Sequence, residues 1–276
     1  MPDFTGRVAL VTGAARGMGR THALALARAG ADLVLVDRCA DVDSVGYPLS
    51  TPEDLKETEH LVADLGARVI TEVLDVRDRD ALESVVAAAV ESFGRVDILL
   101  ANAGVSTMTP ILGGAPSSWD EVIAINLTGV YNSIRAVAPT MMKQRWGRIV
   151  ATASMLGRSA QPAQAAYVAA KWGVIGLVKS AAQDLASFGI TVNAVAPGNV
   201  DTPMVRNDVL FRTVRPDLEN PTAEDAAAVL QTLHVQPIPW IPPTEITDAV
   251  MFLLGAEHMT GSVIDVNAGA SARFTA

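Results

Sequence analysis

Seven short apolar runs alternate with alanine-rich amphipathic stretches along almost the whole chain. Each run has about six residues of Val, Ile, Leu and Ala, which is typical of strands buried on both faces of a sheet. The stretches between them have the apolar spacing of helices. This alternation predicts right-handed β-α-β units, and therefore a single-domain, doubly wound α/β fold with a seven-stranded parallel sheet.

The boundaries of the elements follow from where the apolar pattern stops and from local helix-start signals, such as Thr51 before Pro52 and Asp78 before Asp80. The predicted strands are Arg7–Thr12, Asp32–Asp37, Ala67–Leu74, Val96–Ala101, Gly147–Ala153, Ile190–Val195 and Ser262–Val266. The predicted helices are Gly17–Ala29, Pro52–Leu65, Asp78–Phe93, Ser117–Gln144, Gln164–Ser187 and Thr244–Leu254.

Two segments interrupt the single domain predicted for residues 1–276. Residues 38–51 make an unusually long loop after the second strand. Residues 198–243 are rich in proline and bulky apolar side chains, with one helical stretch near Thr222–Leu233. Each can be interpreted as a tolerated surface insertion. The second is too apolar for a disordered loop, however, so we expect it to form a lid on the substrate side.

Composition excludes several classes of protein. Of the 276 residues 50% are hydrophobic, which excludes intrinsic disorder, and the formal net charge of -9 argues against nucleic-acid and anionic-membrane partners. The single cysteine, Cys39, cannot form an internal disulfide, as is usual in a reducing cytoplasm. The first residues do not resemble a signal peptide, and no apolar run approaches the ~20 residues of a membrane helix. We therefore expect a cytoplasmic protein.

A glycine-rich loop follows the first strand and leads directly into a helix. Gly13 allows the tight turn, Gly17 lets the backbone approach a pyrophosphate, and Gly19 lets the helix pack closely on the strand. The helix N-terminus offers free amides and the positive end of its dipole to phosphate, with Arg16 and Met18 beside it. A plain turn is the alternative, but the loop stands at the β-α junction where dinucleotide binding requires it.

The second strand ends in Asp37, about 20 residues beyond the glycine loop, where a carboxylate can accept hydrogen bonds from the ribose hydroxyls of NAD. Arg16 and Arg38 can instead pair with the 2′-phosphate of NADP. We expect the carboxylate to dominate, because a phosphate beside Asp37 would be repelled, and we predict NAD. Asp75, followed by Val76, ends the third strand, where it can hydrogen-bond adenine or simply stabilise a turn.

The strongest chemical signal is Tyr167 followed four residues later by Lys171, which places both side chains on one face of a helix. A phenol titrates near pH 10, so acting as a base at neutral pH requires its pKa to fall by about 3 units, or roughly 4 kcal/mol. One cation about 4 Å away supplies roughly that energy at an effective dielectric constant of ~20. Lys171 is therefore a sufficient source, helped by an oxidised nicotinamide.

Two further polar residues are predicted near this pair. Ser154 follows the fifth strand, and ligands of parallel sheets bind at the carboxyl ends of the strands, so its hydroxyl can hold a substrate oxygen beside Tyr167. Asn126 lies on the long fourth helix, at a position where a buried face favours an apolar residue. A buried amide whose hydrogen bonds are satisfied is the structural interpretation of Asn126.

Taken together, these motifs resemble the short-chain dehydrogenase/reductase family over nearly the whole chain. The residues that carry the resemblance are Thr12–Gly19, Asp37, Asp75, Asn102-Ala103-Gly104, Asn126, Ser154, Tyr167, Lys171 and Pro197-Gly198. The resemblance implies an acid-base role for Tyr167, substrate-oxygen binding by Ser154, and ribose binding and pKa lowering by Lys171. It also implies that Asn126 holds a water of the proton relay.

The resemblance implies a set of cofactor contacts as well. They are Gly13, Arg16, Gly17, Met18, Gly19, Asp37, Arg38, Asp75, Val76, Asn102, Ala103, Gly104, Tyr167, Lys171, Pro197, Gly198, Val200 and Thr202. The chain departs from the family where a double asparagine is usual, because it has Ala101-Asn102.

The insertion Cys39–Thr51 narrows the resemblance further. Together with Pro52-Glu53-Asp54-Leu55, Thr202-Pro203-Met204 and Arg215–Thr222, it is similar to the mycofactocin-coupled, carveol-dehydrogenase-like dehydrogenases of actinobacteria. That resemblance implies a buried, poorly exchangeable NAD that is recycled in place by the redox peptide cofactor mycofactocin. An ordered insertion over the adenosine half of the site would slow the release of NAD.

These observations predict the reversible oxidation of a hydrophobic secondary alcohol to a ketone, with the apolar residues 199–240 closing over the substrate. A freely exchanging NAD(P)-dependent dehydrogenase or ketoreductase is one alternative, and a non-catalytic NAD-binding regulator is another. No metal site is expected, because the four histidines are scattered without ligand spacing. Among them His234 is interpreted as a hydrogen-bonded structural residue, with pocket lining as its alternative.

The resemblance also implies a homotetramer in which the helices 117–144 and 164–187 pack on symmetry mates. Their alanine-rich faces permit close approach between helices. The same faces suit packing on the sheet equally well, so both interpretations stay open.

Overall fold

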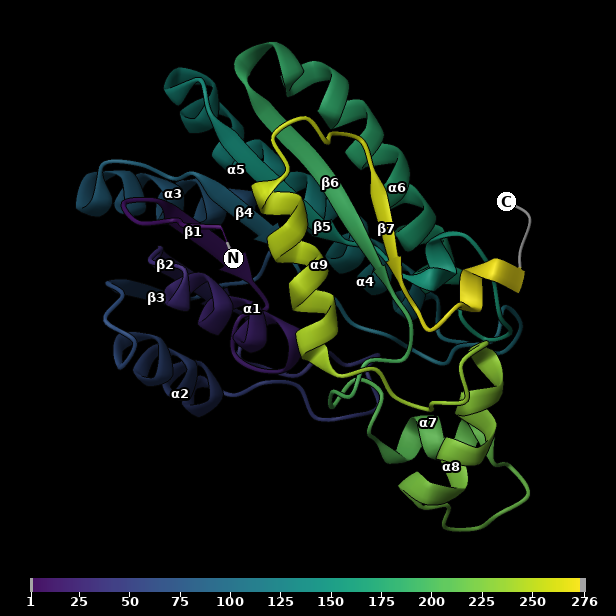
Figure 1. Cartoon of the computed structure of the whole chain (residues 1–276). Helices are drawn as coiled ribbons and strands as arrows, with labels where there is room; N and C mark the ends of the chain where they lie inside the picture. The colour runs from purple at the N-terminus through teal and green to yellow at the C-terminus, as the bar shows by residue number, and fades with distance from the viewer. Residues whose placement is uncertain (1, 274–276) are drawn as a thin grey trace.

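The seven apolar runs form one parallel sheet with the strand order β3-β2-β1-β4-β5-β6-β7 (Figure 1). The computed structural model describes residues 2–273. Its strands are β1 (Val8–Thr12), β2 (Asp32–Asp37), β3 (Val69–Val73), β4 (Ile98–Ala101), β5 (Gly147–Thr152), β6 (Ile190–Pro197) and β7 (Val263–Val266). The predicted fold class is confirmed. The strand order reverses between β1 and β4, and ligands of such sheets bind outside the carboxyl ends of the strands at that point.

Helices cover both faces of the sheet, as a doubly wound fold requires. They are α1 (Gly17–Arg28), α2 (Pro52–Ala63), α3 (Arg79–Phe93), α4 (Pro116–Ile123), α5 (Gly129–Gln144), α6 (Ala165–Leu185), α7 (Asp208–Val214), α8 (Ala223–Leu230) and α9 (Pro243–Gly255). The helix starts predicted at Thr51 and Asp78 are confirmed, because both side chains cap their helices. Thr51 and Asp54 form a reciprocal capping box, and the Asp78 carboxylate accepts the Ala81 amide at 3.0 Å.

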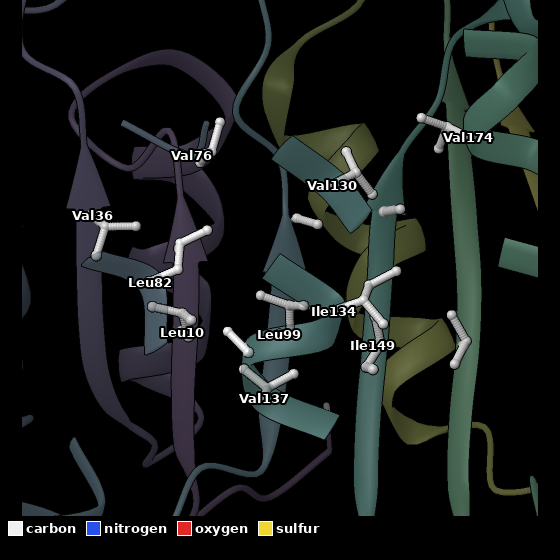
Figure 2. Close-up of a cluster of buried hydrophobic side chains, with 14 of the residues drawn as sticks. Leu10, Val36, Val76, Leu82, Leu99, Val130, Ile134, Val137, Ile149 and Val174 are labelled. Carbon is white, nitrogen blue, oxygen red and sulfur yellow. The ribbon is translucent and has the colours of Figure 1, made fainter. Parts of the chain in front are cut away.

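Two hydrophobic layers, one on each face, fix the sheet in place. Leu10, Val36, Leu99 and Ile149 point from the strands toward α3, α5 and α6 on one face (Figure 2). On the other face, alternate strand residues pack against α1, α2 and α9. Every residue of β1, β5 and β6 is buried, which explains why these strands are mostly apolar instead of alternating between apolar and polar residues.

The predicted helix 117–144 differs from the structure in its middle. Residues Ala124–Thr128 form a π-helical turn between α4 and α5, and Asn126 lies within it. A π turn accommodates one extra residue in a helix and occurs frequently at functional sites. The turn therefore changes the direction of the Asn126 side chain relative to that in a regular helix.

The segment 198–243 also contains more helix than predicted. The stretch near Thr222–Leu233 is α8 followed by a short 3₁₀ turn, but α7 precedes it and was not expected. Asn207 caps α7 by accepting the Leu210 amide at 2.9 Å. Both helices lie beyond the carboxyl ends of the strands, away from the layers on the sheet faces (Figure 1). Within residues 2–273, no helix has the length and apolar character needed to span a membrane.

A buried histidine links α1 to α9 and leads to a prediction about acid stability. The His22 ring accepts or donates a 2.7 Å hydrogen bond at Thr247 Oγ1, and its Nε2 is buried with no partner among the described residues. Burial lowers the pKa of His22 to about 4. In the unfolded chain this histidine has a pKa of about 6.5. Between that pH and the lower pKa of the folded state, the unfolded chain therefore binds a proton at His22 and the folded protein does not.

We expect folding stability to be lost as the pH falls through this window, and His22→Asn to remove part of that loss. Asparagine keeps a hydrogen-bonding group near Nδ1 but cannot titrate. The difference between wild type and variant should amount to about 1 kcal/mol on going from about pH 7.5 to about pH 5.5. Urea unfolding at both pH values and one fixed protein concentration measures it. Equal pH dependence in the two proteins would contradict the prediction.

Candidate active site

The turn between β1 and α1 has glycines where side chains do not fit. Gly13 has a φ of +67°, and a Cβ there would lie 2.8 Å from Ala103 Cα. Gly17 has a φ of +56°, and a Cβ on Gly19 would lie 1.9 Å from the carbonyl oxygen of Gly13. No side chain caps the first amides of α1, so they are available to a phosphate. This cradle is the first observation that fits a dinucleotide.

A pocket at the carboxyl ends of β1, β2 and β4 brings together most of the predicted cofactor residues. Those that line this first pocket are Gly13, Arg16, Gly17, Met18, Asp37, Arg38, Asp75, Val76, Asn102, Ala103, Gly104 and Thr202. Gly19 does not line it, because it packs beneath the turn. Residues of the insertion 38–51 form part of its wall, among them Val42, Tyr47 and Leu49.

The Asp37 carboxylate is held by three donors. Its Oδ2 accepts the Ala15 amide at 3.0 Å, and its Oδ1 accepts the Cys39 amide at 3.2 Å and the Ser50 hydroxyl at 2.6 Å. Ser50 belongs to the insertion, so the insertion helps to orient the carboxylate. A fixed carboxylate at the end of β2 favours ribose hydroxyls and disfavours a 2′-phosphate.

Both arginines that favour NADP are engaged within the protein. Arg38 donates to the Asp41 carbonyl and forms an ion pair with Asp75 at 3.1 Å, while Arg16 donates to the Pro48 carbonyl at 2.5 Å. Burial opposes ionisation of Asp75, but hydrogen bonds from Arg77 hold its pKa below the usual value. Asp75 thus acts as a turn and ion-pair residue in this structure, and its contact with adenine stays a prediction.

A second pocket contains the reactive side chains. Its wall includes Ser154 and Tyr167 on one side and Pro197, Gly198 and Val200 on another. Apolar residues from the segment 198–243 complete it: Met204, Val205, Val209, Leu210, Val214, Val229, Leu230 and Leu233. Met18, Tyr47, Thr202 and Met204 line both pockets, so the two are adjacent.

Ser154 and Tyr167 line the same pocket. Ser154 follows β5, is buried, and accepts the Leu156 amide at 3.1 Å, which fixes its side chain. Burial raises the pKa of Tyr167, and the neighbouring Ser154 side chain lowers it by a smaller amount. The structure places these two side chains in one pocket, while their hydrogen bond and the lowered pKa that base chemistry needs stay predictions.

Lys171 is buried beneath the pocket and does not line it. Its Nζ donates to the Thr152 carbonyl at 2.7 Å and lies 5.6 Å from the centroid of the Tyr167 ring. Burial lowers the pKa of Lys171 to about 8. The ammonium is thus close to the phenol ring, as the four-residue spacing predicts.

Asn126 is fully buried, and both ends of its amide bind the backbone of Val105. Its Oδ1 accepts the Val105 amide at 2.8 Å, and its Nδ2 donates to the Val105 carbonyl at 2.7 Å. Asn126 is therefore a buried amide whose hydrogen bonds are satisfied, as the structural interpretation of the sequence predicted. A Cβ on Gly104 would lie 2.9 Å from Asn126 Oδ1 and 3.6 Å from Lys171 Nζ, so these residues meet at Gly104. The relay role of Asn126 stays a prediction.

The single asparagine after β4 ties three strands together. Asn102 Nδ2 donates to the Thr12 and Gly13 carbonyls at 3.1 and 3.3 Å, and its Oδ1 accepts the Thr152 hydroxyl at 3.3 Å. Ala101, which replaces the other asparagine of the family, is buried within β4. The loop at the end of β4 is thus hydrogen-bonded without a second asparagine.

Sequence reasoning missed several residues of the second pocket. Tyr47 comes from the insertion, Ser106 from the loop after β4, and Gln164 from the start of α6. Asn199 also lines it, and its Nδ2 is buried without a partner among residues 2–273. For Tyr47 a signal was available in the sequence, because the insertion contains one of only three tyrosines in the chain.

His234 has the structural role that the sequence favoured. It is buried, its Nδ1 lies 2.6 Å from the Ile238 carbonyl, and its Nε2 accepts the Asn199 amide at 3.4 Å. The ring therefore joins two parts of the segment 198–243 and does not line either pocket.

The fold and the glycine cradle define a dinucleotide-binding α/β protein, and the Ser154–Tyr167–Lys171 cluster lies where such proteins bind ligands. Comparison with known proteins identifies the family. A sequence model of the family described as short chain dehydrogenase matches residues 7–212. The chain belongs to the short-chain dehydrogenase family.

Individual relatives are similar over nearly their whole length. The (-)-trans-carveol dehydrogenase of Rhodococcus erythropolis is 42% identical over 273 residues, covering 98% of this chain and 99% of the relative. The crystal structure of carveol dehydrogenase from Mycobacterium avium in complex with NAD has a TM-score of 0.96 at 44% identity, covering 99% of this chain and 100% of that one. A short-chain dehydrogenase from Mycobacterium paratuberculosis bound to NAD has a TM-score of 0.89 at 34% identity, with 98% and 99% covered.

Proposed function

We propose that this chain reversibly oxidises a small hydrophobic secondary alcohol to a ketone, with Tyr167 as the acid-base group, and that it does so in the cytoplasm. As a family member whose relatives bind NAD, the chain is an NAD-dependent alcohol dehydrogenase. The second pocket is the observation that supports a hydrophobic alcohol as substrate and Tyr167 as the acid-base group, because Ser154 and Tyr167 line it together with apolar side chains of the lid.

The residues around the first pocket fit NAD. The turn at Gly13 and Gly17 leaves space for a pyrophosphate, and Asp37 is oriented for ribose hydroxyls. We propose that the remaining contacts with NAD come from the other predicted cofactor residues that line the first pocket, and from Pro197, Gly198, Val200 and Thr202. When bound, NAD supplies the hydride acceptor, and the protein supplies orientation and proton transfer.

Proton transfer is the task of the buried cluster. Ser154 donates a hydrogen bond to the alcohol oxygen and holds it at the phenol, and Tyr167 as phenolate takes the hydroxyl proton. Lys171 favours the phenolate by its charge and binds the nicotinamide ribose, and Asn126 holds a relay water. The common pocket of Ser154 and Tyr167 and the nearby Lys171 ammonium support these roles.

The insertion supports the proposal that NAD is retained and recycled in place by mycofactocin. Arg16 donates to the Pro48 carbonyl, and the Ser44 amide donates to Glu121 on α4 at 3.2 Å. Gly46 packs against Val209 of α7, where a Cβ would lie 3.0 Å from Val209 Cγ2. The insertion is thus an ordered wall of the first pocket, attached to the α1 turn, α4 and the lid. Releasing NAD past it requires several of these contacts to break.

The NAD content of the freshly purified protein tests this proposal. We expect stoichiometric NAD in the supernatant after denaturation, because the insertion retains it. We also expect turnover of a hydrophobic secondary alcohol with an artificial dye acceptor and little turnover with added NAD. Measuring both activities on the same preparation provides the internal control.

Two results would contradict parts of the proposal. An empty protein that steadily forms NADH from added NAD is an ordinary, freely exchanging dehydrogenase, and retention is then wrong. A protein that holds NAD but shows no alcohol-dependent reduction with either acceptor is a binding protein and not a catalyst, and the alcohol dehydrogenase activity is then wrong.

We also propose that the chain forms a homotetramer through α4, α5 and α6. Their alanine-rich faces allow close packing between helices. In addition, Trp119 on α4 and Trp172 on α6 are each about half exposed, which is unusual for large aromatic side chains and supports burial against another copy.

A further inference from the structure

Tyr47 brings a second phenol to the substrate pocket. It lies in the insertion, is 7% exposed, and lines both pockets. Its hydroxyl oxygen accepts the Ser106 amide at 3.3 Å. Burial raises the pKa of Tyr47 to about 12, with a smaller contribution from the neighbouring Tyr167, so the phenol keeps its proton. That proton has no acceptor among residues 2–273.

Ser106 offers a second donor beside it. Gln164 Nε2 donates to the Ser106 hydroxyl oxygen at 3.1 Å, and Gln161 Nε2 donates to Gln164 Oε1 at 2.8 Å, which holds the Gln164 amide in that orientation. The Ser106 oxygen is therefore used as an acceptor, while its own proton has no acceptor within the described part of the chain. Two hydroxyl protons thus lie unpaired at one end of the pocket.

This polar end belongs to the substrate side and not to the cofactor side. Ser106, Gln161 and Gln164 line the second pocket and do not line the first, and the Tyr47 hydroxyl contacts Ser106. Ser154 and Tyr167 hold the reacting oxygen elsewhere in the same pocket. Most of the lid side chains that complete the wall are apolar and cannot accept a hydrogen bond.

We propose that the Tyr47 and Ser106 hydroxyls bind a second oxygen atom of the substrate, so that the preferred substrate is a bifunctional alicyclic alcohol, either a diol or a hydroxyketone. Tyr47 is buried and Ser106 is partly buried. Hydroxyls removed from water in proteins are almost always hydrogen-bonded, so a carbonyl or hydroxyl oxygen of the ligand would supply the acceptor that both lack here. The inference rests on the proposed alcohol oxidation. It adds that the pocket recognises a second oxygen of the ligand besides the reacting one.

Kinetics with matched alcohols test the proposal. The probes are cyclohexanol and cyclohexanediols that differ in the spacing of their two hydroxyls. We expect wild type to prefer one diol over cyclohexanol. We also expect Tyr47→Phe to lower kcat/KM for that diol about tenfold more than it lowers kcat/KM for cyclohexanol. Ser106→Ala should act in the same direction. Tyr131→Phe, which removes a hydroxyl from an exposed tyrosine on α5, is the matched control.

A binding measurement separates this inference from the proposed reaction. Calorimetric titration of the NAD-loaded Tyr167→Phe protein, with and without Tyr47→Phe, compares cyclohexanone with the cyclohexanediones. A larger loss of affinity for a dione than for cyclohexanone on removal of the Tyr47 hydroxyl supports the inference even if no alcohol is oxidised, in which case only the proposed function fails. Equal effects on monofunctional and bifunctional ligands, or none on either, would overturn the inference and leave the alcohol dehydrogenase intact.

Discussion

Tyr167→Phe is expected to lower kcat for alcohol oxidation by about 10²- to 10⁴-fold, the usual contribution of a general acid-base group. Phenylalanine keeps the ring in its place next to Lys171 and removes only the hydroxyl, which belongs to the same pocket as Ser154. The alcohol proton then has no acceptor at the reacting oxygen. Steady-state kinetics with the dye acceptor measure the effect.

The NAD content of the same variant distinguishes lost chemistry from lost structure. We expect it to equal that of wild type, because the first pocket does not include Tyr167. Tyr131→Phe again serves as the control for removing a phenol elsewhere. A Tyr167→Phe protein whose kcat stays within a few-fold of wild type would eliminate Tyr167 as the proposed base.

Gly19→Ala is expected to destabilise the protein by about 4 kcal/mol or more and to abolish NAD retention, as large effects of single substitutions come from strain of this kind. The added methyl would lie 1.9 Å from the Gly13 carbonyl oxygen and 2.8 Å from its carbon. Both are backbone atoms of the cofactor turn, so relief requires moving that turn away from α1. Urea unfolding and NAD analysis of the purified variant measure the two effects.

Gly176→Ala is the matched control within a helix. Gly176 lies in α6, and a Cβ there has no neighbour within 4 Å. Alanine should therefore stabilise the protein by roughly 0.5–1 kcal/mol through helix propensity. Similar stability changes in the two variants would show that the close contact at Gly19 does not control the fold.

The fold was predictable because its signals are local. Continuous apolar runs such as Val8–Thr12 identify strands buried on both faces, and Thr51 marks a helix start by its own capping bonds. The π turn at Asn126 was not predictable, since its extra residue is set by packing between α4 and α5 and has no sequence propensity. The sequence signal for helix α7 is weaker, because it consists of an Asn207 cap followed by a single acidic residue. The surrounding segment is rich in proline, which favours a loop.

The site was predictable where position in the sheet determines it. Gly13, Asp37, Asn102 and Ser154 follow strands, and the carboxyl ends of parallel strands meet at one edge. Tyr47 was not predictable, because a loop side chain is positioned by tertiary contacts, here Glu121 on α4 and Val209 on α7, that lie far along the chain.

Those distant contacts also determine the order in which the site is completed during synthesis. Protein synthesis delivers the N-terminal residues first. The phosphate turn, Asp37 and the insertion emerge early, but the insertion gains its contact with Glu121 only after β4 has been made, and its contact with Val209 only after β6. A nascent chain therefore presents its dinucleotide cradle with the wall unattached.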